Sequence, residues 1–252
     1  MHSSVANDRN KAATDPFATT DWSAVLEAAD AASPQSRAAL GELYQAYHYP
    51  LYVFVRRRGY SEHDAQDVLH DFFATLIEKN YLKDVARERG RFRAFLLGAL
   101  KHFLANDWHR SRREKRGGAS TFVSLEDWMA DAERRFQVVA SGVPPEVQFD
   151  REWARTLLNR VMSVLRTEFE SAGNGAQFAA LKVLLSTPGS GAAYALAAAD
   201  LGTTERAVKV AVHRLRQRYQ AALRREIGQT VGPAGEIEAE LRHLAAVLRL
   251  DL

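Results

Sequence analysis

Two kinds of side chain recur at helical spacing between residues 204 and 223. The apolar set would form one buried stripe and consists of Val208, Val212, Leu215, Tyr219 and Leu223. The basic and polar set would lie on another face and consists of Arg206, Lys209, His213, Arg216 and Gln220. Cations and amides along one helix face suit the phosphates and base edges of a DNA major groove. The pattern therefore predicts a DNA-binding helix, and a solvated basic face is the alternative.

The residues in front of this helix are typical of a tight turn between two helices. A short, alanine-rich segment beginning near Tyr194 stops at Leu201 and Gly202. Glycine enters positive φ without steric cost, so Gly202 suits the turn. Thr204 can accept a hydrogen bond from a free amide in the first turn of the next helix. The segment therefore predicts a helix-turn-helix whose second helix enters a major groove.

A second basic tract, residues 90–116, mixes cations with aromatic and amide groups outside its apolar stripe. These side chains are Lys101, His102, Asn106, Trp108, His109, Arg110, Arg112 and Arg113. The mixture suits single-stranded or opened DNA, because cations follow the phosphates while planar groups stack on exposed bases. The alternative is a basic helix end favoured by the helix dipole, with Trp108 packed inside.

An acidic helix is expected over residues 61–79, with Ser61 as its N-cap. Asp64, Asp67 and Asp71 recur along one side of it, next to Phe72 and Phe73. An acidic row beside an exposed aromatic ring, which we expect Phe73 to be, is a candidate docking surface for a basic helix of a partner protein. A solvated acidic face is the alternative.

The sequence offers little for catalysis. His63, Asp67 and His70 have a spacing that could hold iron or zinc, but no further ligands converge on them in the sequence. The chain contains no GxxxxGK[ST], HExxH or GxSxG motif. A metal-dependent nuclease is therefore a remote alternative. We expect a protein that is not an enzyme, has no catalytic residues, and needs neither a metal nor another cofactor.

Composition narrows the class further. The 252 residues carry a net charge of only +3, yet positive charge gathers in 87–116 and 206–225 and acidic residues gather elsewhere. Such clustering predicts polyanion binding at defined places. The chain has no cysteine, no apolar run long enough to span a membrane, and no secretory h-region in residues 1–20. We therefore expect a cytoplasmic protein.

The apolar periodicity predicts an all-α fold, because no segment alternates with the period of a strand. Besides the helix-turn-helix, helices are expected at 22–30, 36–58 (kinked or restarted at Pro50), 61–79, 92–113, 125–135, 149–170, 177–185 and 236–250. Two small helical domains are expected at 21–118 and 148–230. The remaining parts would be a disordered tail at 1–20, a linker at 119–147 and a C-terminal helical extension at 231–252.

Two basic helical modules with an acidic helix in the first resemble a bacterial RNA polymerase sigma factor of the sigma-70 family, extracytoplasmic-function type. The likeness covers about residues 38–117 and 149–228. The first block is similar to sigma region 2 and contains LYQAYHYPLYVFVRRRGYSEHDAQDVLHDFFATLIEK and GRFRAFLLGALKHFLANDWHRSRREKR. The second block is similar to the helix-turn-helix of region 4 and contains AAADLGTTERAVKVAVHRLRQRYQ.

The resemblance implies three groups of contact residues and a role in promoter recognition and melting. The group facing the clamp helices of the polymerase β′ subunit would be Asp64, Asp67, Asp71 and Phe72. The group that captures and opens the −10 element would be Arg91, Arg93, Lys101, Asn106, Trp108, Arg110, Arg112 and Arg113. The group entering the −35 major groove would be Thr204, Arg206, Lys209, His213 and Arg216. The linker would thread the polymerase between the modules.

The implied partners are core RNA polymerase, through its β′ clamp helices and β flap, promoter DNA, and an anti-sigma factor or other inhibitor. No membrane or small-molecule substrate is implied. A stand-alone helix-turn-helix regulator that binds duplex operators is the alternative function. The sequence departs from the family at the alanine-rich helix around Ala195 and Leu196. The C-terminal extension is expected to pack on the second module, or else to serve as an inhibitory or partner-binding helix.

Overall fold

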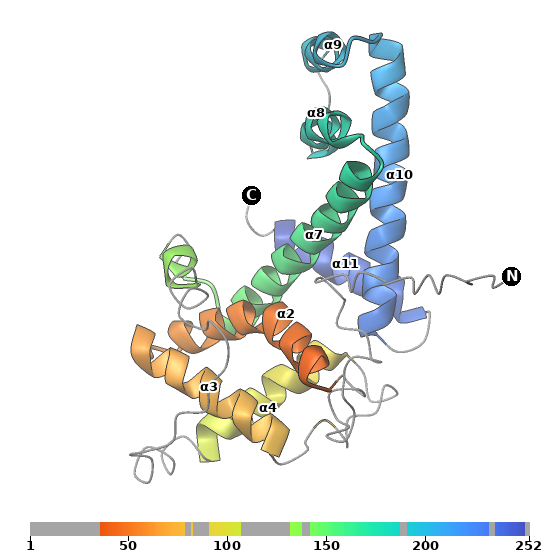
Figure 1. Ribbon diagram of the computed structural model, residues 1–252. Helices are drawn as coiled ribbons and strands as arrows, with labels where there is room; N and C mark the ends of the chain where they lie inside the picture. The colour runs from red at the N-terminus through yellow and green to blue at the C-terminus, as the bar shows by residue number, and fades with distance from the viewer. Residues whose placement is uncertain are drawn as a thin grey trace, which may run out of the picture.

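The computed structural model describes residues 36–78, 82, 91–106, 132–137, 142–186, 191–231 and 235–249. All regular secondary structure within these ranges is helical, which confirms the predicted all-α class for them. The helices are α2 (Ser36–Arg57), α3 (Glu62–Glu78), α4 (Phe92–Asn106), α7 (Pro145–Ser171), α8 (Gly175–Ser186), α9 (Gly191–Asp200), α10 (Glu205–Thr230) and α11 (Gly235–Arg249) (Figure 1). A short helical segment also covers residues 132–136. The helix expected at 22–30 lies outside the described residues.

Local signals set most helix ends. α3 starts after Ser61, whose Oγ accepts a hydrogen bond from the backbone amide of Asp64 at 3.1 Å, as predicted. α2 continues through Pro50, so of the two outcomes predicted there, a kink or a restart, the restart does not occur. α7 begins at Pro145, within the segment expected to be linker and four residues before the predicted start. Proline suits the first helical position because its missing N–H would have no partner there.

Two hydrophobic cores lie at opposite ends of the molecule (Figure 1). The first is built mainly on α2, α3 and α4, and the second on α8, α9 and the front half of α10. α7 contributes Phe149 and Trp153 to the first core and Val161 and Leu165 to the second. α10 likewise reaches the first core with Ile227. The boundary expected near residue 148 therefore does not separate the cores, since two long helices run through both.

The C-terminal helix is part of the folded body. α11 packs on α7 and α10 and buries Leu244 and Val247 in the first core. The packing predicted for this helix is therefore present, but it joins the first core and the two long helices rather than the second core alone. Among the described helices, none is both long enough and apolar enough to cross a membrane.

Candidate nucleic-acid interface

The turn between α9 and α10 has the geometry that its sequence predicts. Gly202 adopts a φ of 60°, in the left-handed region where a side chain would be strained. The Thr204 hydroxyl accepts a hydrogen bond from the backbone amide of Ala207 at 3.2 Å. These two features stop α9 and start α10, so that a short turn joins two helices that pack against each other.

The apolar stripe of α10 determines which of its faces points outward. Val208, Val212 and Leu215 are each 1% exposed in the second core. Tyr219 and Leu223 are half-buried beside them, and burial raises the pKa of the Tyr219 hydroxyl. The predicted stripe is therefore confirmed. The opposite side of the helix faces solvent.

The outward face of α10 is cationic around one apolar side chain. Arg206, His213 and Arg214 are exposed, and none of them has an ion-pair partner among the described residues. Val210 lies between them and is 46% exposed. The pattern of polar residues at helical spacing does not include Val210, because valine is apolar. Its position four residues after Arg206 could have placed it on this face.

Two other residues of the predicted stripe lie at the side of this face and have partners within the protein. Lys209 is 4.0 Å from the carboxylate of Glu205, and its ammonium lies 5.5 Å from the ring centre of Tyr194 on α9. Arg216 is half-buried and donates a hydrogen bond to the backbone oxygen of Leu184 at 2.8 Å. The predicted −35 residues therefore lie on α10 and its N-cap Thr204, and Arg206 and His213 are the ones that are exposed on the helix without a partner among the described residues.

A groove of about 670 Å³ borders this face on the side of the turn between α7 and α8. Its walls include Arg206, Arg214 and Arg218 of α10 and Phe169 and Asn174 from the opposite side. Arg218 pairs with Glu168 at 2.6 Å, and its guanidinium lies 4.7 Å from the ring centre of Phe169. Glu168 therefore balances the charge of Arg218, and the cations of this groove without an ion-pair partner among the described residues are Arg206 and Arg214.

The cations at the start of α4 have a different environment. Arg93 is only 6% exposed and forms ion pairs with Asp150 of α7 and with Glu240 of α11, the latter at 2.7 Å. Arg91 pairs with the same Glu240 at 2.8 Å. Burial by itself would lower the pKa of Arg93, but the two carboxylates raise it above its ordinary value. Arg93 therefore lies inside the protein, and this placement does not support its assignment to DNA contact.

Of the remaining residues in the predicted −10 group, Lys101 and Asn106 belong to α4, and the other four lie outside the described residues. Lys101 pairs with Glu146 in the first turn of α7 at 2.8 Å, and this hydrogen bond is the main cause of the lowered pKa of Glu146. Asn106 is the last residue of α4. Trp108, Arg110, Arg112 and Arg113 lie outside the described residues.

The acidic side of α3 is exposed only in part. Asp67 is exposed and lies 3.5 Å from His63, whereas Asp64 and Asp71 are half-buried. Phe72 is 2% exposed in the first core, so its side chain is not part of this surface. Phe73, which we expected to be an exposed aromatic, is half-buried with its ring centre 4.8 Å from that of Tyr44. Asp67 is therefore the most accessible of the residues predicted to bind a partner.

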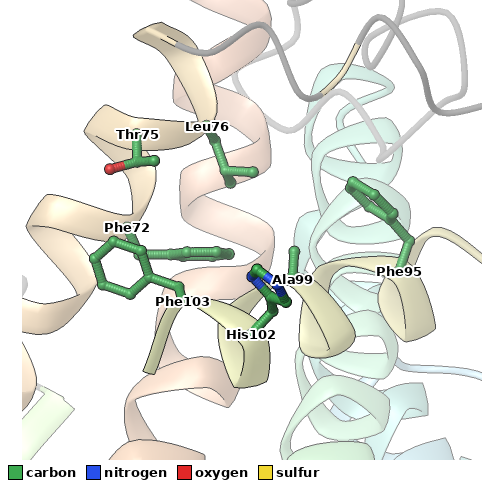
Figure 2. A pocket seen from close by; sticks show the side chains of 7 residues that line it. All are labelled: Phe72, Thr75, Leu76, Phe95, Ala99, His102 and Phe103. Carbon is green, nitrogen blue, oxygen red and sulfur yellow. The ribbon is translucent and has the colours of Figure 1, made fainter. Parts of the chain in front are cut away.

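A smaller apolar pocket of about 220 Å³ lies between α3 and α4. Its walls include Phe72, Leu76 and Thr75 of α3 and Phe95, His102 and Phe103 of α4. Figure 2 shows these side chains around a shared hollow, with each helix supplying one side. Most of the side chains that line the pocket are apolar, and Thr75 and His102 are the polar residues of its lining.

In the described part of the chain, no three His, Asp or Glu side chains gather as a metal site would require, and His63, Asp67 and His70 do not form one. Comparison with protein-family models, curated proteins and solved structures found no match to this chain. The geometry of α10 and the sequence patterns are therefore the features that indicate a function.

Proposed function

We propose that this protein is an RNA polymerase sigma factor that binds core polymerase and directs promoter-specific initiation. The observation that carries the proposal is the helix pair α9 and α10, joined by a tight turn, with Arg206 and Arg214 exposed on the outward face of α10. A helix with buried apolar residues on one side and free cations on the other fits a major groove. The protein itself catalyses no reaction, because the polymerase makes the RNA.

The α3 surface supports the same proposal from the other end of the molecule. Asp67 is exposed on a helix whose sequence resembles the core-binding helix of the family. A carboxylate at this place would attract a basic helix of the polymerase clamp. The α3 surface lies over the first core and the α10 surface lies over the second core. This separation suits a protein that holds polymerase with one surface and promoter DNA with the other.

The proposal is tested by measuring the affinity of the full chain for core polymerase and transcription from a promoter selected with the complex. Asp67→Arg should weaken core binding at least tenfold and leave the melting temperature within a few degrees of the wild type. The matched control is Glu170→Arg, which reverses an exposed charge at the far end of α7. Wild-type core affinity for Asp67→Arg would disprove the docking assignment, and no affinity of the wild-type chain would disprove the proposal.

A second candidate is a helix-turn-helix regulator that binds duplex operators without polymerase. The observation that favours it is the internal pairing of Arg91, Arg93 and Lys101, which leaves α10 as the more open basic surface. A gel shift with the chain alone separates the candidates. Tight, sequence-specific duplex binding without polymerase supports the regulator, whereas specific binding that appears only with core polymerase supports the sigma factor.

A further inference from the structure

Val210 occupies the middle of the outward face of α10. It lies four residues from both Arg206 and Arg214 and three from His213, so all of them project from the same side of the helix. Its side chain is 46% exposed, and the buried stripe of Val208, Val212 and Leu215 is on the other side. Val210 also lines the groove toward the turn between α7 and α8, but it remains exposed there, so core packing does not explain a valine at this position.

Helix stability does not explain it either. A β-branched residue loses side-chain freedom in a helix and lowers helix propensity relative to alanine or arginine. Single exposed apolar side chains are common on protein surfaces, so exposure alone carries no meaning. The location of Val210 is informative, because the cations beside it, Arg206 and Arg214, form the face that would meet an anionic partner. A side chain there touches whatever the cations bind.

The chemistry of this face fits duplex DNA better than a protein surface. The buried core of a protein interface is more apolar than the rest of the protein surface, and one valine among arginines offers little of such a core. The DNA major groove presents phosphates and purine edges to cations, and its one apolar group is the C5-methyl of thymine. Val210, a short branched side chain between Arg206 and Arg214, matches a thymine methyl group that lies between polar groups of the DNA.

We propose that Val210 contacts the C5-methyl group of a thymine in the major groove and so makes α10 select thymine at one position. This inference rests on the proposed function, in which α10 binds promoter DNA. Arg206 and Arg214 would hold the neighbouring phosphates or purine edges on either side. Val210 then adds specificity, while the cations supply most of the affinity.

The test begins with a random-sequence duplex library selected by the full chain together with core polymerase. In the enriched duplex each thymine is then replaced in turn by uracil, which removes only the methyl group. One replacement should weaken binding of the wild type by about three- to fivefold, the loss expected for one buried methyl. Val210→Ala should bind the thymine duplex more weakly by a similar factor and bind the thymine and uracil duplexes equally. Val210→Ile should keep the preference for thymine.

Val183→Ala is the matched control, because Val183 is 62% exposed on α8 and lies on another helix. It should keep the wild-type response to uracil. Since position 210 is on the helix surface, Val210→Ala should melt at the wild-type temperature or slightly above it. The inference is overturned if no thymine methyl affects binding, or if Val210→Ala still distinguishes thymine from uracil. If no duplex is enriched at all, the proposed function fails and the role of Val210 fails with it.

Discussion

The two basic regions of this protein contain the same kinds of side chain in opposite environments. At the start of α4, Arg91 and Arg93 meet the buried carboxylate of Glu240, and Lys101 further along meets Glu146. On α10, Arg206 and Arg214 face solvent with no ion-pair partner among the described residues. The difference lies in what the neighbouring helices present. The acidic groups of α7 and α11 reach Arg91, Arg93 and Lys101 in the first region, whereas on α10 they reach Arg218 and Arg224 but not Arg206 or Arg214.

This contrast shows that a cluster of cations in a sequence is not by itself a surface for DNA. In the first region the positive charges hold three helices together. A buried guanidinium that has lost its water needs its carboxylates, and those carboxylates need it. In the second region Arg206 and Arg214 remain available to a partner. We therefore expect substitutions in the first region to change stability and substitutions in the second region to change binding.

The largest expected effect is on folding, from removing the guanidinium at the centre of the buried cluster. Arg93→Ala would remove one guanidinium from two carboxylates, leaving Glu240, which is 0% exposed, paired with Arg91 and leaving Asp150 paired with His243. We expect a loss of about 3–5 kcal/mol in the free energy of unfolding, measured by urea denaturation. Arg206→Ala, at an exposed site, should change it by less than about 0.5 kcal/mol. Equal effects of the two substitutions would remove the distinction between the regions.

Acid should destabilise the first core through His48. This side chain is 3% exposed, stacked on Tyr44, and burial lowers its pKa from 6.5 to about 4. The unfolded chain therefore takes up a proton between pH 6.5 and 4 that the folded protein does not, so stability falls as pH falls through this window. The loss due to His48 should total roughly 3 kcal/mol.

The variant that tests this effect is His48→Phe, which keeps a stacked ring and has no proton to gain. Its unfolding free energy should depend less steeply on pH between 6.5 and 4, as measured by urea denaturation at a series of pH values. His213→Asn removes an exposed histidine of the second region and should leave the steep dependence in place. A wild-type slope in His48→Phe would show that another group is responsible.

An intermediate effect is expected on DNA affinity. Arg206→Ala should weaken binding to the selected duplex by about 1–3 kcal/mol for a lost base contact, or reduce the slope of log affinity against log salt by about one for a lost phosphate contact. Lys209→Ala should cost less, because Lys209 also has Glu205 and Tyr194 as neighbours. Titrations at several salt concentrations measure both quantities. A larger loss of DNA affinity in Lys209→Ala than in Arg206→Ala would show that the binding face is centred closer to α9.

The smallest expected effect concerns an ion pair of α11 outside the buried cluster. Glu238 pairs with Arg224, and both side chains are more than half exposed. Glu238→Gln should lower the unfolding free energy by less than about 1 kcal/mol, because water already solvates both charges. Glu240→Gln, two residues along the same helix, should cost clearly more. Similar losses in the two variants would mean that Glu240 does not hold the first region together.

Much of the secondary structure could be predicted from the sequence because its causes are local. Apolar spacing located α2, α3 and the buried stripe of α10, and the caps Ser61 and Thr204 placed two helix starts. These features depend on residues within one or two turns of each other. The predicted start of α7 is four residues late because Pro144 and Pro145 fall in the expected linker, although proline also begins helices.

Tertiary structure alone decided which charges remain free and where the cores lie. Arg93 and Glu240 are 147 residues apart, and no periodicity within α4 indicates a carboxylate that arrives on α11. The sharing of α7 between two cores depends on which helices pack along its length, and that is also a long-range property. The sequence by itself determined which helices form and that one face of α10 is basic. The packing of distant helices decided that the cations of α10 face solvent while Arg93 is buried, because burial and pairing depend on neighbours that the local pattern does not contain.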